Sequence, residues 1–306
     1  MNKSTPIKAW ISALRLRTLP LSVSGILFGS FVSMFDGFWK LETFLLALTT
    51  TVAYQIVSNL ANDLGDSLKG TDNDGRIGPT RAVQSGVISQ QQMKKAILIA
   101  IGISVFATVG LLFSASDYLN LNSIVFYSVL AISCIVAALL YTIGKRAYGY
   151  YGLGDLMVFL FFGVVSVIGV YPLYGGSIHF NLIYPAITVG LLSTAVLNLN
   201  NMRDRQNDER SNKRTIAVIL GPTISKFYHF LLIVLALITH LIFLVKFDST
   251  ALYAACLPAG IILLIHLRKV MNTTNPKDFD GELKIVALST FALSLLTSIA
   301  ITVISN

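Results

Sequence analysis

The chain has 306 residues, of which 54% are hydrophobic and only 12% are charged. Soluble domains average about 25% charged residues, so these values exclude a soluble globule and a charge-rich disordered chain. Cys134 and Cys256 lie in apolar runs, which excludes a disulfide-based scaffold. The composition therefore predicts an all-α, polytopic membrane protein.

Membrane-spanning segments account for most of the sequence. A helix needs roughly 20 apolar residues to cross the hydrocarbon core of a bilayer, and it satisfies its own backbone groups there. We predict a bundle of nine transmembrane helices that forms a single domain over residues 1–306, preceded at Met1–Arg17 by a basic, amphipathic interfacial helix. The predicted spans are approximately 18–35, 41–60, 96–114, 121–141, 153–172, 182–200, 226–246, 250–267 and 284–304.

The basic residues predict the orientation of this bundle. Of 23 Lys and Arg residues, 21 lie in the N-terminal segment and in the loops after even-numbered spans, and the opposite side has only Lys40 and Lys246. Cytoplasmic loops are enriched in Lys and Arg. We therefore expect a protein of the cytoplasmic (inner) membrane with its N-terminus inside and Asn306 outside. Because this topology explains most of the net charge of +8, we predict no nucleic-acid partner.

Two polar cytoplasmic loops, one after the second predicted span and one after the sixth, contain a large share of the acidic residues. The first contains Asp63, Asp66, Asp72 and Asp74, and the second contains Asp204, Asp208 and Glu209.

The two loops resemble each other. Asn200, Asp204 and Asp208 are spaced i, i+4, i+8, which places them on one face of a helix, and Asn62 and Asp66 repeat the first two positions. Four spans separate the two motifs. This pattern suggests an internal duplication of spans 1–4 and 5–8, with a ninth span added.

The chemistry of these loops suits a divalent cation with a diphosphate. Carboxylates at i, i+4 repel each other, and a bound cation removes that penalty. Oxygen ligands of this kind suit Mg²⁺, which commonly takes one or two carboxylates together with substrate phosphates. Nearby basic residues could bind the remaining phosphate oxygens: Lys69, Arg76, Arg81, Lys213 and Arg214. The alternative is that both are ordinary solvated loops with balanced charges.

These motifs resemble those of the UbiA-type membrane-embedded prenyltransferases, a family with nine helices and Asp-rich motifs after the second and sixth. Its members transfer a polyprenyl chain from polyprenyl diphosphate to an aromatic acceptor. The matching motifs are Asn62-Asp63-xx-Asp66, Asn201-x-Arg203-Asp204-xxx-Asp208, Lys213-x-Thr215 and Tyr141-xxx-Lys145-Arg146. The third acid of the family's first motif falls on Gly70, and the nearest acid is Asp72. That shift is similar to the branch that prenylates 1,4-dihydroxy-2-naphthoate.

The resemblance implies a set of site residues. As Mg²⁺ ligands it implies Asp63, Asp66, Asp204 and Asp208, with Asp72 as the nearest substitute for the missing third acid. As residues that complete or orient this set it implies Asn59, Asn62 and Asn201. For the diphosphate it implies Lys69, Arg76, Arg81, Tyr141, Lys145, Arg146 and Lys213. For the acceptor we expect Arg17, with Arg15 as an alternative, and Asp155.

Several alternatives stay open at this point. The acceptor could be 4-hydroxybenzoate, chlorophyllide or haem, and a secondary transporter would also combine repeats with polar residues. Lys145 and Arg146 could serve as positive-inside anchors. Asp155 could serve its helix N-terminus instead of an acceptor.

Overall fold

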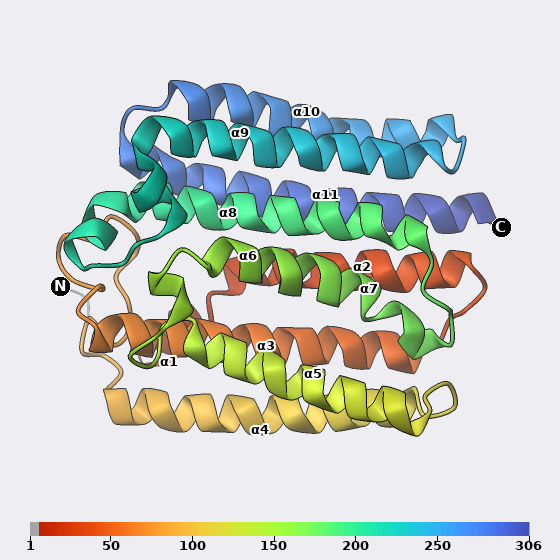
Figure 1. Ribbon diagram of the computed structural model, residues 1–306, viewed down its shortest axis with the longest axis horizontal. Helices are drawn as coiled ribbons and strands as arrows, with labels where there is room; N and C mark the ends of the chain where they lie inside the picture. Colours follow the sequence, from red (N-terminus) through yellow and green to blue (C-terminus); the bar gives the residue numbers. More distant parts are fainter. Residues whose placement is uncertain (1–5, 306) are drawn as a thin grey trace.

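The computed structural model describes residues 6–305, and within them every regular element is helical (Figure 1). Residues 1–5 of the predicted interfacial segment, and Asn306, lie outside the described residues. The α-helices are α1 Pro6–Leu14, α2 Leu19–Phe35, α3 Leu41–Leu68, α4 Gln90–Ser114, α5 Leu121–Leu140, α6 Gly154–Val158, α7 Ser166–Ile168, α8 Ile183–Arg210, α9 Ile216–Val245, α10 Thr250–Asn272 and α11 Phe279–Ser305. The 3₁₀ segments are η1 Leu16–Thr18, η2 Tyr148–Tyr150, η4 Tyr171–Tyr174, η5 Phe180–Leu182 and η6 Pro276–Asp278, and η3 Phe159–Val165 is a π-helix.

The described chain confirms the predicted nine spans. Nine of its helical segments are long and apolar enough to cross a membrane. Most of the long helices run roughly along the long axis of the molecule (Figure 1). Segments α6, η3, α7 and η4 follow one another and together form the fifth of these spans, Gly154–Tyr174.

Helix α8 is central to the bundle. It packs against α9, α11 and η3, while α11 also packs against α2 and α10. On the other side of the molecule, α3 packs against α2, α4 and α5. Burial follows this arrangement, because many residues of α8 are buried, whereas Ala137 is the single buried residue of α5. Helix α5 therefore presents most of its surface to the surrounding lipid.

Local chemistry explains several of the helix boundaries. Ser89 begins α4 with a capping box, in which its hydroxyl accepts the Gln92 N–H and the Gln92 side chain accepts the Ser89 N–H. The Thr215 hydroxyl caps α9 in a similar way, by accepting the Val218 N–H. Farther along α9, Gly221 has a φ of +74°. Glycine tolerates this positive φ, and the helical backbone of α9 is interrupted by a kink there, directly before Pro222.

Helix α8 and the π-helix η3 approach each other at two glycines. A Cβ atom on Gly163 would lie 2.4 Å from the Ala186 carbonyl oxygen and 2.8 Å from the Gly190 Cα atom. Small residues permit such close backbone contact between membrane helices. This contact fixes the wall formed by η3 against the helix that contains the second acidic motif.

The two acidic motifs begin on helices and not in loops. Helix α3 continues to Leu68 and α8 to Arg210, beyond the predicted span ends at 60 and 200. The i, i+4 spacing of the polar residues is compatible with a continuing helix, and their side chains face the bundle interior. Asn62, Asp66, Asp204 and Asp208 are therefore held by rigid backbone.

Candidate active site

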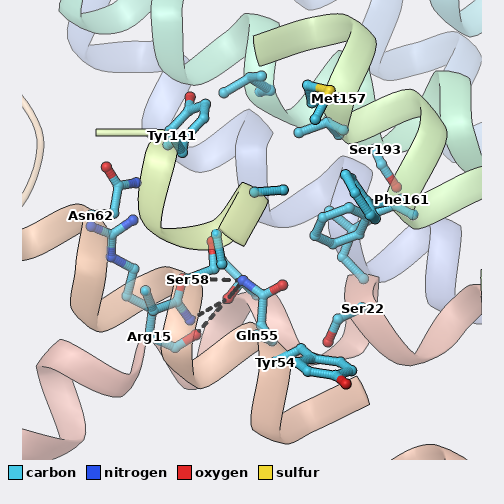
Figure 2. Close-up of a pocket in the computed structure, with 18 of the residues that line it drawn as sticks. Arg15, Ser22, Tyr54, Gln55, Ser58, Asn62, Tyr141, Met157, Phe161 and Ser193 are labelled. Atoms are coloured by element: carbon cyan, nitrogen blue, oxygen red, sulfur yellow. Dashed lines mark hydrogen bonds between the residues drawn. The ribbon is translucent and has the colours of Figure 1, made fainter. Parts of the chain in front are cut away.

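A cavity of about 530 Å³ lies inside the bundle (Figure 2). Along α3 its lining extends from Ala47 to Asp66, which corresponds to about 28 Å at 1.5 Å per helical residue. The part near Ala47 is apolar and includes Leu111 and Leu173, whereas the part near Asp66 is charged. The cavity is therefore amphipathic along its length.

Charged side chains of both signs line the polar part of the cavity. Five are acidic and six are basic, so that the charges nearly balance. The acidic residues are Asp66, Asp72, Asp204, Asp208 and Asp280, and the basic residues are Arg15, Arg17, Arg76, Arg81, Lys213 and Lys284. Four of the five predicted metal ligands and five of the predicted phosphate- or acceptor-binding cations, with Arg15 counted as the alternative to Arg17, thus come together in one place.

Asp66 and Lys213 form the link between the two acidic motifs. The Lys213 ammonium donates to both carboxylate oxygens of Asp66, each at 3.2 Å, and the Tyr150 hydroxyl donates to Asp66 Oδ1 at 2.7 Å. With its side-chain amide oriented to satisfy both neighbours, Asn62 donates to Asp66 at 3.1 Å and accepts from Arg15 at 3.2 Å. Burial alone would lower the pKa of Lys213, but attraction to Asp66 and Asp208 outweighs it and raises that pKa. Lys213 is therefore a permanent cation.

The loop after α3 contributes a second group of charges. Arg76 lies between two acids, with Nε 3.1 Å from Asp72 and Nη2 3.5 Å from Asp204. Arg81 lies 3.9 Å from Asp72 Oδ2, and this buried oxygen has no hydrogen-bond partner among the described residues. Burial raises the pKa of Asp72, and burial together with the charges of Arg15 and Arg76 lowers the pKa of Arg81 well below its usual value. A cation bound near Asp72 would lower its pKa again, and an anion bound near Arg81 would raise its pKa again.

Asp204 and Asp208 lie one helical turn apart on α8 but have different surroundings. Arg203 binds Asp204 with two hydrogen bonds, and the Gly78 N–H donates to it at 3.2 Å. Asp208 is only 4% exposed, and its carboxylate forms no hydrogen bond or ion pair within residues 6–305. Asp208 is consequently the predicted ligand whose oxygens are most available to the cavity.

Asp63 lies outside the cavity lining. Its two oxygens accept the backbone N–H groups of Ala82 and Val83 at 3.2 and 3.3 Å. It thereby fixes the turn that follows Arg81 against α3. The assignment of Asp63 as a metal ligand stays a prediction, and this geometry favours a role in holding the loop.

The remaining predicted residues divide into those near the cavity and those away from it. Asn59 lines it and donates to the Leu14 carbonyl oxygen, while Tyr141 lines it at the end of α5, where burial raises the pKa of Tyr141 to about 12. Asn201 is buried in α8 outside the lining. Lys69 lies 3.8 Å above the Tyr150 ring, also outside the lining.

Three further predicted residues lie away from the cavity. Lys145 and Arg146 are exposed in the loop after α5. Asp155 is buried at the start of α6, where it accepts a hydrogen bond from Tyr228 at 3.1 Å and lines a separate pocket between α6, α8 and α9. This position favours the role of Asp155 at its helix N-terminus.

Two residues of the site, Arg203 and Asp280, were not among the predicted site residues, and Arg15 was expected only as an alternative to Arg17. Arg15 has a left-handed φ of 50°, and its Nε and Nη2 atoms are buried without hydrogen-bond partners in the part of the chain that the structure describes. Arg203 is fully buried beside Asp204, and Asp280 contacts it from the first turn of α11. Arg203 could have been inferred from the sequence as an arginine within the second motif, whereas no local signal marked Asp280.

The donor set fits a hard divalent cation. Across residues 6–305, no three His, Cys, Asp or Glu side chains form a metal site by themselves. Instead, Asp66, Asp72, Asp204 and Asp208 face a shared cavity with basic residues between them. Mg²⁺ commonly takes one or two carboxylates and completes its shell with phosphates and water. A phosphate-bearing ligand would therefore be needed to bring the ion and the carboxylates together.

Comparison with known proteins identifies the family. The sequence model described as the UbiA prenyltransferase family matches residues 22–300. The chain is 40% identical to 1,4-dihydroxy-2-naphthoate octaprenyltransferase of Escherichia coli over 273 residues, covering 88% of this chain and 87% of that protein. It is 35% identical to the protein of the same name from Mycobacterium tuberculosis over 240 residues, covering 77% and 78%.

Solved structures show the same fold. A UbiA homolog from Archaeoglobus fulgidus bound to DMAPP and Mg²⁺ has a TM-score of 0.62 at 13% identity, covering 95% of this chain and 99% of that one. An apo UbiA homolog from Aeropyrum pernix K1 has a TM-score of 0.64 at 13% identity, covering 96% and 98%. The helical bundle, its charged cavity and the sequence matches agree, and the chain belongs to the UbiA prenyltransferase family.

Proposed function

We propose that this prenyltransferase transfers a polyprenyl chain from polyprenyl diphosphate to 1,4-dihydroxy-2-naphthoate in a Mg²⁺-dependent reaction that releases diphosphate and CO₂. The amphipathic cavity supports this proposal most directly, since it combines six basic and five acidic side chains with an apolar region along α3. The acceptor follows from the relatives that are named for it and that align with most of the chain.

Basic residues would bind and orient the diphosphate. Lys213, Arg76, Arg81 and Arg15 all line the charged part of the cavity, and charge-assisted hydrogen bonds to phosphate are among the stronger polar contacts in proteins. Because these groups are already held by helices and buried contacts, they can stabilise the negative charge that develops on the leaving group.

Carboxylates would hold the metal. We assign Asp66, Asp72, Asp204 and Asp208 to this role, since all four line the cavity. When bound there, Mg²⁺ supplies Lewis-acid stabilisation of the diphosphate oxygens. Asp63 supports the same site from outside by holding the backbone at Ala82 and Val83.

The apolar region would hold the first isoprene units and exclude water. Cleavage of the C1–O bond sends its electron pair to the departing diphosphate and leaves an allylic cation at C1. The carboxyl-bearing ring carbon of the acceptor then forms a bond to C1. Loss of CO₂ breaks the bond to the carboxyl carbon and returns its electrons to the ring. A cation of this kind reacts with water, so an apolar lining around C1 would protect it.

Arg17 is our assignment for the acceptor carboxylate. It lies in η1, directly before α2, and lines the cavity. Its single ion pair within residues 6–305 is a long contact of 3.8 Å to Asp280. A guanidinium with a weak partner can exchange it for an incoming carboxylate. The distribution of basic residues further supports a cytoplasmic location for the charged part of the cavity.

An acceptor screen tests the proposal. Purified protein in detergent, supplied with Mg²⁺ and octaprenyl diphosphate, should convert 1,4-dihydroxy-2-naphthoate and release its labelled carboxyl carbon as CO₂. Faster conversion of 4-hydroxybenzoate would overturn the acceptor assignment. The secondary-transporter alternative is not supported, because the family match is to prenyltransferases and the acids cluster at one end of the bundle.

A further inference from the structure

Asp280 joins the site from a part of the chain remote from both acidic motifs. It lies in the first turn of α11, and its carboxylate lines the cavity. Its Oδ1 atom lies 2.5 Å from Arg203 Nη1 and 3.8 Å from Arg17 Nη1. Asp280 therefore bridges the second acidic motif and the N-terminal end of α2.

Arg203 is held between two carboxylates. On one side its Nε and Nη2 atoms donate to the two oxygens of Asp204 at 3.1 and 2.6 Å, and Nη2 also donates to Asn200 at 2.8 Å. On the other side Nη1 donates to Asp280. The Arg203 side chain is completely buried, so its charge is balanced by these neighbours and not by water.

This arrangement determines how much negative charge Asp204 offers to the cavity. With Asp204 as its only carboxylate partner, a buried guanidinium would neutralise that acid and occupy both of its oxygens. A second carboxylate gives the guanidinium another partner, so Asp204 does not balance the charge of Arg203 alone. Asp204 can then turn an oxygen towards a cation without leaving Arg203 unpaired, which would be costly in a buried position.

We propose that Asp280 is a positioning residue: it holds Arg203 from the side opposite Asp204 and so keeps Asp204 available to the divalent cation that accompanies the diphosphate substrate. This inference rests on the proposed function. It assigns a role to an acid outside both motifs. Replacing a residue that orients a metal ligand without touching the metal typically lowers the metal affinity by about 10- to 100-fold.

The test compares two neutralising substitutions two residues apart. D280N removes the charge that faces Arg203 but keeps the size of the side chain. D278N removes a charge from the exposed Asp278 in η6 and serves as the matched control. D280E restores the carboxylate on a longer side chain and is expected to recover most of the lost function.

The first readout is binding without turnover. Mg²⁺ is titrated against each protein in the presence of inorganic diphosphate, and the rise in Tm is recorded. We expect D280N to need about tenfold more Mg²⁺ than wild type for half of the maximal rise, whereas D278N matches wild type. Equal midpoints for D280N and D278N, at equal Tm without ligand, would overturn the proposal.

The second readout separates binding from chemistry. In the prenyl-transfer assay, D280N should raise the Mg²⁺ concentration for half-maximal rate about tenfold, while the rate at saturating Mg²⁺ falls much less. A lower saturating rate with an unchanged Mg²⁺ midpoint contradicts the assignment. If wild type shows no Mg²⁺-dependent transfer and no stabilisation by Mg²⁺ with diphosphate, the proposed function itself fails, which is a distinct outcome.

Discussion

The Lys213 ammonium lies 3.2 Å from each carboxylate oxygen of Asp66, a residue 147 positions earlier in the chain. One acid of the first motif is thus paired with the base that follows the second motif. Both side chains are buried. Removing one member of such a pair leaves an unpaired charge in a poorly solvated place.

Replacing Lys213 with Met should therefore affect both stability and activity. We expect a loss of about 3 kcal/mol in the free energy of unfolding and a strong fall in kcat/KM for the prenyl diphosphate. K69M is a matched control, since Lys69 also contacts the Tyr150 ring but lies outside the cavity lining. Denaturant titration in detergent and initial rates measure the two effects. Similar losses in both variants would contradict the assignment of Lys213.

Asp208 and Asp63 should respond in opposite ways to substitution by Asn. In D208N the Mg²⁺-dependent rate should fall about 100-fold, which corresponds to the upper end of the free energy of a hydrogen bond to a charged group. Stability without ligand should hold or rise, since its carboxylate has no hydrogen-bond partner within residues 6–305.

D63N should instead lower the thermal stability, because Asn has only one acceptor oxygen for the N–H groups of Ala82 and Val83. We expect a loss of about 1–3 kcal/mol from the unsatisfied donor, with a Mg²⁺ midpoint close to wild type. Thermal unfolding and a Mg²⁺ titration distinguish these cases. A D63N variant of normal stability that requires far more Mg²⁺ would show that Asp63 is a ligand after all.

Arg15 and Arg17 should affect different substrates. R15A is expected to raise the KM for the prenyl diphosphate, since Arg15 contacts Asn62 beside Asp66. R17A is expected to raise the KM for the aromatic acceptor. Each increase should be about tenfold, equivalent to one charge-assisted hydrogen bond of about 1.5 kcal/mol. Both KM values are measured for both variants. If R15A raised the KM for the acceptor and R17A raised the KM for the prenyl diphosphate, the two roles would have to be exchanged.

The membrane orientation can be tested by labelling single cysteines in a variant that lacks Cys134 and Cys256. K145C and S116C place exposed thiols at opposite ends of α5. An impermeant maleimide added to intact cells should label S116C only, whereas both should react after the membrane is opened. Labelling of K145C in intact cells would reverse the predicted topology.

The sequence predicted helix bounds most accurately for helices that face lipid, because the bilayer requires an apolar surface along their whole length. The predicted span 121–141 corresponds to α5, Leu121–Leu140, because lipid on most of its surface requires an uninterrupted apolar run. The prediction was less accurate for the ends of α3 and α8. Polar residues near these ends, such as Asp66 and Asp208, are buried by the protein, so the loss of hydrophobicity did not mark the end of the helix.

Within the site, the sequence predicted which residue types would meet but not how they pair. Asp63 and Asp66 are three positions apart in the same motif, yet one holds backbone outside the cavity and the other faces Lys213 inside it. Helical spacing alone leaves both options open. The role of Asp280 depends entirely on the packing of α11 against α2 and α8, which no local pattern encodes.

Helix α5 has a further consequence for ligands of this protein. It forms one wall of the cavity through residues such as Leu130 and Cys134, while Ala137 is its single buried residue. A single helix thus separates the cavity from the surrounding lipid, and an amphiphilic inhibitor is concentrated on the lipid side of this helix by partitioning. The degree of inhibition then depends on the inhibitor's mole fraction in lipid or detergent and not on its concentration in the total volume. Adding more detergent at a fixed total dose should weaken inhibition by simple dilution in the apolar phase.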